Sequence, residues 1–242
     1  MLEIWSRYFR LASLVFTLSA CNETKRNAST SDSKTSSTDT ICIGSPDAKS
    51  FAVYLHGVDG VTASSQELGN RKVLESLAKN LSMRIALPRA SKACPNDASS
   101  LCWGWTFDER ELDAAATAIR TAASSCFEGK SFGLVGFSNG GYLLTKMVRD
   151  CSLKRRVPLA SWAVAAGSAL FKGSLDPEPR SLSECGKLRF VTGTKDEFNF
   201  DPQHHLLDEL KRKGADVGEV AFDGGHLLAE VPLASAIQEC QR

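Results

Sequence analysis

The sequence predicts a single doubly wound α/β domain over residues 41–242, with helices on both faces of a mostly parallel sheet. Three observations support this fold class. Short apolar runs alternate along the chain with longer segments that repeat apolar residues at helical spacing. The short runs are almost continuously apolar, which is typical of parallel strands covered on both faces. The unit is about 200 residues long, enough to bury one sizeable core, and it contains no internal repeat.

The first half of this unit alternates strand, helix, strand and helix. Residues 51–55 (FAVYL) form a buried-strand run that ends at His56-Gly57. Apolar side chains recur at helical spacing through residues 65–81, which predicts a helix. A strand at 83–87 stops at Pro88, because proline cannot donate to a strand ladder. An alanine-rich helix is expected at 108–125, with Asp108 as its cap.

The second half continues the same alternation to the end of the chain. Strands are expected at 132–137, 158–166, 188–192 and 217–222, and helices at 139–149, 202–213 and 227–238. Only residues 167–186 separate the strand at 158–166 from the next one, so no cap domain is expected there. A site on this unit is therefore expected to be uncapped and open to small or surface-accessible substrates.

The composition excludes several classes of protein. Hydrophobic residues make up 43% of the chain and charged residues 24%, which is typical of a soluble globular protein and not of a disordered or collagen-like one. With 29 Lys and Arg against 28 Asp and Glu, the formal net charge is +1. Such a chain has no basic excess to hold a phosphate backbone, so no nucleic-acid partner is expected.

The N-terminus indicates export. Arg7 and Arg10 precede an apolar run at 11–20 that is too short to cross a bilayer, which needs roughly 20 apolar residues. A positive region followed by such a run is typical of a secretory signal peptide. The run ends in Leu18-Ser19-Ala20-Cys21, which resembles the lipobox of bacterial lipoproteins. An ordinary signal peptide or a short anchor helix is the alternative.

The lipobox resemblance implies that residues 1–20 are removed and that Cys21 is lipidated and becomes the first mature residue. Asn22 in the next position favours the outer membrane, facing the periplasm or the exterior. Residues 21–40 contain ten Ser or Thr and no large apolar side chain, so they are expected to form a flexible tether. The protein is expected to contact the membrane through this lipid only and to be a monomer.

A G-x-S-x-G motif lies between a predicted strand and a predicted helix, at Gly136-Phe137-Ser138-Asn139-Gly140. A serine at a strained strand-to-helix turn needs small residues two positions before and after it. The helix then begins at Asn139, whose backbone N–H can face an oxyanion beside Ser138. The motif predicts that Ser138 is a nucleophile.

A nucleophilic serine requires a base, and His226 is the best candidate among four histidines. It follows the last predicted strand in the loop Asp223-Gly224-Gly225-His226. His56 is expected to support an early loop, and His204 and His205 to occupy a helix face. No C-x-x-C or H-E-x-x-H spacing is present, so neither a metal site nor any cofactor is expected.

The acid that orients the histidine is expected just beyond the strand at 188–192. Asp196 is the first choice, and Glu197 and Asp201 are the second and third.

These residues together resemble a known superfamily. The order Ser138, Asp196, His226, each after a predicted strand, is similar to that of the α/β-hydrolases over residues 51–242. The loop Leu55-His56-Gly57-Val58 resembles the one that supplies a second oxyanion N–H, which would be that of Val58. Asn139 departs from many relatives, and only its backbone is expected to matter.

Two shorter segments resemble particular branches of the superfamily. Leu87-Pro88-Arg89-Ala90 is similar to the small carboxylesterases and phospholipases, a group that includes acyl-protein thioesterases. Cys102-Trp103-Gly104-Trp105 resembles polyhydroxyalkanoate-depolymerase-like and feruloyl-esterase-like enzymes. Trp103 and Trp105 are candidates for the wall of an acyl or aryl pocket, with plain packing as the alternative.

The resemblance implies a serine esterase that works through an acyl-enzyme. A thioesterase or a peptidase could use the same three residues, and a non-catalytic binding lipoprotein of the same fold is a further alternative.

The remaining cysteines are expected to form disulfides, because exported proteins meet an oxidising compartment. Cys94 and Cys102 fall on the active-site edge of the sheet and are predicted to pair. Cys42, Cys126, Cys151, Cys185 and Cys240 fall on the opposite edge, and pairs should not cross between edges. Cys126–Cys151 and Cys185–Cys240 are the predicted far-edge pairs, with Cys42 unpaired or competing. Seven buried thiols are the alternative.

Overall fold

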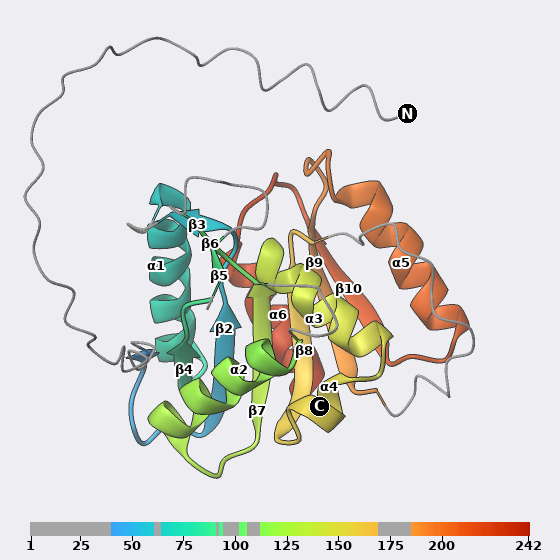
Figure 1. Ribbon diagram of the computed structural model, residues 1–242. Coiled ribbons are helices and arrows are strands. Elements are labelled where there is room, and N and C mark those ends of the chain that lie inside the picture. Colours follow the sequence, from blue (N-terminus) through green and yellow to red (C-terminus); the bar gives the residue numbers. More distant parts are fainter. Residues whose placement is uncertain (1–39, 61–63, 91, 94–101, 106–111, 169–184) are drawn as a thin grey trace, which may run out of the picture. The chain divides into compact units, whose positions relative to one another are not determined.

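Within the residues that the structure describes, seven strands form the main sheet, in the order β1-β4-β2-β7-β8-β9-β10 (Figure 1). The computed structural model describes residues 40–60, 64–90, 92–93, 102–105, 112–168 and 185–242, which all belong to the unit Ser37–Arg242. All neighbouring strands in the sheet are parallel except the pair β1 and β4. The predicted fold class is confirmed.

The expected strands are all present, with ends that differ by one or two residues. They are β2 (Ser50–Leu55), β4 (Met83–Leu87), β7 (Phe132–Phe137), β8 (Ala160–Ala166), β9 (Lys187–Gly193) and β10 (Val217–Phe222). Each lies in or beside the buried core, and alternate side chains point to opposite faces. In β2, for example, Val53 packs with the helices of one face and Tyr54 with those of the other. This alternation is the geometric property of a strand.

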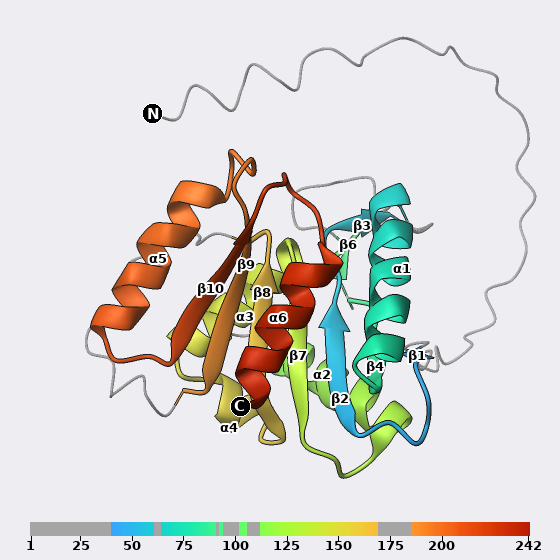
Figure 2. The same ribbon diagram turned by 180° about the vertical axis from the view of Figure 1, so that it is seen from behind.

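Helices cover both faces of the sheet. The side chains of α2 (Leu112–Phe127), α3 (Asn139–Arg149) and α5 (Phe200–Arg212) pack in one apolar cluster with the strands. Those of α1 (Ser65–Asn80) and α6 (Glu230–Gln241) pack in a second cluster on the opposite face. Figure 2 shows these two helices on the other side of the sheet from that seen in Figure 1. The last helix begins at Glu230 and not at 227, because the loop that carries His226 continues to Ala229.

Several elements were not predicted from the sequence. The short strand β1 (Ile41–Ile43) pairs antiparallel with β4 at the edge of the sheet, and α4 (Leu153–Arg156) is a single turn. A small second sheet joins β3 (Asp59–Gly60), β6 (Cys102–Gly104) and β5 (Lys92–Ala93). Segments of two to four residues are too short to show a periodic pattern, so their pairing depends on the surrounding fold.

The far-edge disulfide predictions were wrong in their partners. Cys42 pairs with Cys126, with Cα atoms 5.7 Å apart, and Cys151 pairs with Cys185 at 4.7 Å. Cys240 is a buried free thiol. The reason is strand order: Cys42 lies in β1 at one edge of the sheet, beside the end of α2, whereas Cys151 follows α3 and Cys185 precedes β9. Both bonds nevertheless join cysteines of the same edge, as the topology requires.

Some expectations lie outside the described residues. These are the signal peptide, Cys21 and the tether at 1–39, the cap Asp108, the pair Cys94–Cys102 through Cys94, and most of the connection 167–186. In the part of the chain that the structure describes, no helix is long and apolar enough to cross a membrane.

Candidate active site

Ser138 occupies the sharp turn between β7 and α3. Its backbone angles are φ 49° and ψ −115°, a left-handed conformation that is uncommon for a residue with a side chain and costs about 1–3 kcal/mol. Its N–H donates to Ala166 O at 2.8 Å, and its carbonyl accepts the N–H of Tyr142 at 3.0 Å. The Ser138 side chain makes no capping hydrogen bond to the helix that follows. The strained turn therefore presents a hydroxyl that has no capping role.

The glycines on either side of Ser138 are required by close backbone contacts. A Cβ on Gly136 would lie 2.5 Å from Gly140 O, and a Cβ on Gly140 would lie 2.2 Å from Leu55 O. No side chain larger than hydrogen fits at either position without displacing the backbone. The predicted reason for the motif is thus confirmed in the geometry.

The loop after β2 runs beside Ser138 and is held by His56. The His56 carbonyl accepts the N–H of Gly140 at 3.1 Å, and a Cβ on Gly57 would lie 3.2 Å from Ser138 Cβ. His56 Nε2 accepts the N–H of Ala90 at 2.9 Å, so Nδ1 carries the proton and donates to Gly57 O at 2.5 Å. Burial lowers the pKa of His56 and keeps it neutral in this role.

The backbone N–H groups of Val58 and Asn139 are the predicted oxyanion donors. Among the hydrogen bonds of the described residues, none uses the N–H of Val58 or of Asn139. Val58 follows the loop that touches Ser138, and Asn139 is the first residue of α3. Their role as donors to an oxyanion beside Ser138 stays a prediction.

The Asn139 side chain has a role that the sequence analysis missed. Its Oδ1 accepts the N–H of Trp105 at 2.5 Å, and its Nδ2 donates to Trp105 O at 3.4 Å. The Trp105 ring donates from Nε1 to His56 O at 3.1 Å and is 2% exposed. Asn139 and His56 thus attach the segment 102–105 to the start of α3. The pocket role of Trp103 and Trp105 stays a prediction.

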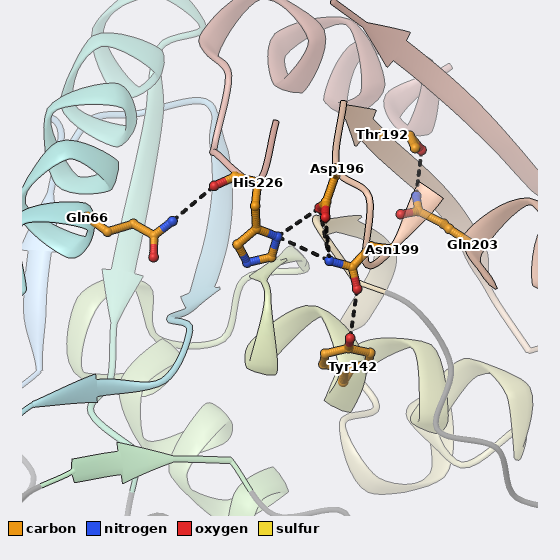
Figure 3. A network of polar contacts seen from close by, with 7 residues as sticks. All are labelled: Gln66, Tyr142, Thr192, Asp196, Asn199, Gln203 and His226. Carbon is orange, nitrogen blue, oxygen red and sulfur yellow. Dashed lines mark hydrogen bonds and ion pairs between the residues drawn. The ribbon is translucent and has the colours of Figure 1, made fainter. Parts of the chain in front are cut away.

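Asp196 and His226 meet at the ends of the neighbouring strands β9 and β10. His226 Nδ1 lies 2.8 Å from Asp196 Oδ2. The Asp196 side chain is 1% exposed, whereas that of His226 is 34% exposed. The imidazole is thus held at Nδ1 by a buried carboxylate and keeps Nε2 for another partner. Gln66 of α1 donates from Nε2 to the carbonyl of His226 at 3.1 Å (Figure 3).

The imidazole of His226 lies against Phe137 and Gly167, two residues close to Ser138. The ring of Phe137, which precedes Ser138, has its centroid 5.0 Å from that of His226. Gly167 follows Ala166, to which Ser138 is hydrogen-bonded, and a Cβ on Gly167 would lie 3.0 Å from His226 Cε1. Parallel strands β7, β8, β9 and β10 bring these residues to one edge of the sheet.

Asn199 and Tyr142 complete this cluster, and neither was singled out from the sequence. Asn199 Nδ2 lies 3.0 and 2.9 Å from the two carboxylate oxygens of Asp196 and 3.2 Å from His226 Nδ1. The Tyr142 hydroxyl donates to Asn199 Oδ1 at 2.7 Å. Figure 3 shows the four side chains converging from α3, the β9–α5 loop and the β10–α6 loop. No local pattern relates residues that are 57 positions apart.

The other candidate side chains are placed elsewhere. Glu197 and Asp201 are exposed, and Asp196 is the carboxylate that contacts His226. His204 lies on α5 with Nε2 3.0 Å from Glu219 Oε2, and His205 is exposed on the same helix. Within the described ranges, no group of three or more His, Cys, Asp or Glu side chains is arranged to hold a metal ion.

Comparison with known proteins identifies the fold but no close relative. No protein-family model matches the chain, and no curated protein matches it. Solved structures do match over most of their lengths. A carboxylesterase from Bacillus cereus has a TM-score of 0.59 at 16% identity, covering 86% of this chain and 95% of that one. Acyl-protein thioesterase 2 from Zea mays has a TM-score of 0.59 at 18% identity, covering 85% and 97%.

YahD, solved with malic acid, has a TM-score of 0.59 at 15% identity and covers 84% of this chain and 100% of that one. Identities this low show the fold alone. The chain therefore has the α/β-hydrolase fold that its motifs resemble.

Proposed function

We propose that this protein is a serine hydrolase that cleaves carboxylic esters through an acyl-enzyme. The observation that carries the proposal is the Asp196–His226 contact of 2.8 Å at the sheet edge where the strained turn presents Ser138. A buried carboxylate on Nδ1 orients the imidazole and stabilises its protonated form, which leaves Nε2 to act on a serine hydroxyl. The names of the carboxylesterase and the thioesterase that share the fold support the same reaction class.

The reaction begins with attack of Ser138 Oγ on the ester carbonyl. A bond forms between Oγ and the carbonyl carbon while His226 Nε2 takes the hydroxyl proton. The negative charge that develops on the carbonyl oxygen is stabilised by the N–H groups of Val58 and Asn139. Collapse of this intermediate breaks the bond to the leaving oxygen, which takes the proton from His226 and departs as the alcohol.

Water then attacks the acyl-enzyme by the same series of steps. His226 removes a proton from the water as its oxygen bonds to the acyl carbon, and the same proton returns to Ser138 Oγ as the acid leaves. The enzyme ends in its starting protonation state. A thioester would follow the same path with a thiol as the leaving group, and the fold shared with an acyl-protein thioesterase makes it the second candidate substrate.

The test combines covalent labelling with turnover. A fluorophosphonate probe should label Ser138, and the protein should hydrolyse p-nitrophenyl acetate or p-nitrophenyl octanoate. Ser138→Ala and His226→Ala should each abolish turnover, since the three residues act as a unit. Asp196→Asn should also lower turnover severely, but by less than Ser138→Ala or His226→Ala.

Glu197→Gln is the matched control for the acid, because Glu197 is the adjacent carboxylate and is exposed. It should leave kcat unchanged. Labelling of Ser138 without turnover of any ester or thioester would instead favour a binding protein. More than a few per cent residual kcat in pure Ser138→Ala would place the nucleophile elsewhere.

We also propose that the protein is an exported lipoprotein held through Cys21. The two disulfides among the described residues support an oxidising compartment. Cys21→Ser should stop incorporation of labelled palmitate and release the protein from the membrane fraction. Unchanged membrane retention in that variant would contradict the lipid anchor.

A further inference from the structure

Asn199 lies at the start of a helix but does not use its side chain to cap it. Asparagine is a preferred residue at this position, because its side chain can accept a backbone N–H of the first turn. In α5, Asn199 makes no such hydrogen bond. Its side chain turns instead toward the carboxylate of Asp196, with Nδ2 within 3.0 Å of both oxygens. The backbone of Asn199 is itself helical, so its side chain is free of a capping role and is used for this contact.

The neighbours of Asn199 determine how its amide is oriented. An ionised carboxylate only accepts hydrogen bonds, so the amide must present its NH2 group to Asp196 and not its oxygen. The oxygen then faces Tyr142, whose hydroxyl donates to it at 2.7 Å. Asn199 is 4% exposed and Asp196 is 2% exposed, so water replaces neither contact readily. The amide is therefore fixed at both ends.

This arrangement decides which donors reach the Asp196 carboxylate. His226 Nδ1 and Asn199 Nδ2 both lie within hydrogen-bonding distance of Asp196 Oδ2. The amide N–H groups share the negative charge of the carboxylate and restrict its rotation. The Asp196 oxygen that meets His226 is thus held in a single position.

The same amide connects the two halves of the site. Tyr142 lies one turn into α3, the helix that begins at Asn139 directly after Ser138. Asp196 and Asn199 belong to the loop between β9 and α5, and β8 separates β9 from β7. The Tyr142–Asn199 hydrogen bond crosses this gap (Figure 3). It ties the helix that presents Ser138 to the loop that presents Asp196.

We propose that Asn199 is a positioning residue of the active site: it holds the Asp196 carboxylate against His226 and, through Tyr142, sets this pair relative to Ser138. The kinetic consequences rest on the proposed hydrolase function. The effect on the His226–Asp196 pair itself does not, and it is measurable without turnover.

The first test is kinetic, with p-nitrophenyl acetate as the substrate. Asn199→Ala should lower kcat by about 10- to 100-fold, because misplacement by about 1 Å is enough for such a loss. KM should stay within about twofold, since Asn199 does not face the substrate. Tyr142→Phe should lower kcat by about fivefold, as expected for one hydrogen bond. The double variant should be no slower than Asn199→Ala alone, because Tyr142 acts through Asn199.

Asn199→Asp separates positioning from helix capping. Aspartate caps a helix as well as asparagine does, so a role limited to helix capping would leave this variant at wild-type activity. A positioning role predicts the opposite, because a second carboxylate cannot donate to Asp196. Two carboxylates beside His226 would also hold its protonated form more strongly. The acid limb of the kcat/KM profile should therefore move to higher pH in Asn199→Asp, and by less in Asn199→Ala.

A spectroscopic measurement makes the inference independent of catalysis. Proton NMR follows the His226 Nδ1–H signal and the titration of the ring in the full-length protein. Asn199→Asp should move the titration to higher pH, and Tyr142→Phe should perturb the Nδ1–H signal without unfolding the chain. These two variants keep the test valid if Asn199→Ala fails to fold.

The outcomes are distinguishable. Wild-type kcat, pH profile and His226 titration in Asn199→Asp would overturn the positioning role, whatever the thermal stability of the variants. Absence of turnover in the wild type, with the His226 Nδ1–H signal still perturbed in the uncharged variant Tyr142→Phe, would overturn the hydrolase function and leave the positioning role supported.

Discussion

Gly140→Ala is the sharpest test of how the fold places Ser138. A methyl group at Gly140 would lie 2.2 Å from Leu55 O, 2.6 Å from Leu55 C and 2.7 Å from Leu55 Cβ. Leu55 is the last residue of β2, which is buried between β4 and β7. Close C···O contacts in proteins are about 3.3 Å, so α3 would have to withdraw from β2 by about 1 Å.

The expected loss of stability follows from that displacement. Overpacking costs about 3 kcal/mol or more where, as here, backbone lies on both sides of the contact. Replacing glycine by alanine inside a helix returns about 1 kcal/mol. The net loss of about 2 kcal/mol should lower the Tm by roughly 4–8 °C in a domain of this size. A 1 Å shift of Ser138 from the Val58 N–H should also lower kcat by about 100-fold.

Gly69→Ala is the matched control. Gly69 is also in a helix, α1, but a Cβ there meets no atom within 4 Å. This variant should gain about 0.5–1 kcal/mol and keep wild-type kcat. Circular dichroism during thermal and urea unfolding measures the stability, and p-nitrophenyl acetate turnover measures kcat. Equal stability and activity in the two variants would refute the close packing of α3 on β2.

Three further predictions concern other parts of the domain. Peptide mapping of the unreduced protein should find the disulfides Cys42–Cys126 and Cys151–Cys185. Cys240 should resist iodoacetamide until the chain unfolds, because burial raises the pKa of its thiol to about 12. Rapid alkylation of Cys240 in the native protein would contradict its burial. Asn139→Ala should destabilise the fold by about 1–3 kcal/mol in urea, since the N–H of buried Trp105 loses its acceptor; an unchanged midpoint would mean that this contact is not formed. Burial raises the pKa of Glu67, so its contribution to stability is present below the ordinary carboxyl pKa and is lost as pH rises through the raised value. The stability of Glu67→Gln relative to the wild type should therefore increase from pH 4 to pH 8 in urea unfolding, and a decrease would contradict the burial of this carboxyl.

Local sequence patterns were sufficient for the fold class and for most of the elements. Apolar runs and helical spacing depend on neighbours within one or two turns, so they predicted the six parallel strands and five main helices to within a few residues. The strand–G-x-S-x-G–helix order also predicted the turn at Ser138. The backbone of such a turn passes so close to Gly136 and Gly140 that neither position has room for a side chain. The order of His226 and Asp196 after successive strands placed both at one edge, since parallel strands end on the same side.

Contacts between distant segments were decided by the tertiary structure alone. Cys42 pairs with Cys126 because the unpredicted strand β1 lies beside β4 near the end of α2. Asn199 reaches Tyr142 across 57 residues, because the order of β7, β8 and β9 brings α3 and the β9–α5 loop together. Periodicity records which face of an element is buried but not which element covers that face. The sequence by itself therefore determined the elements and the catalytic candidates, and only the packing of the sheet and its helices decided which side chains hold them in place.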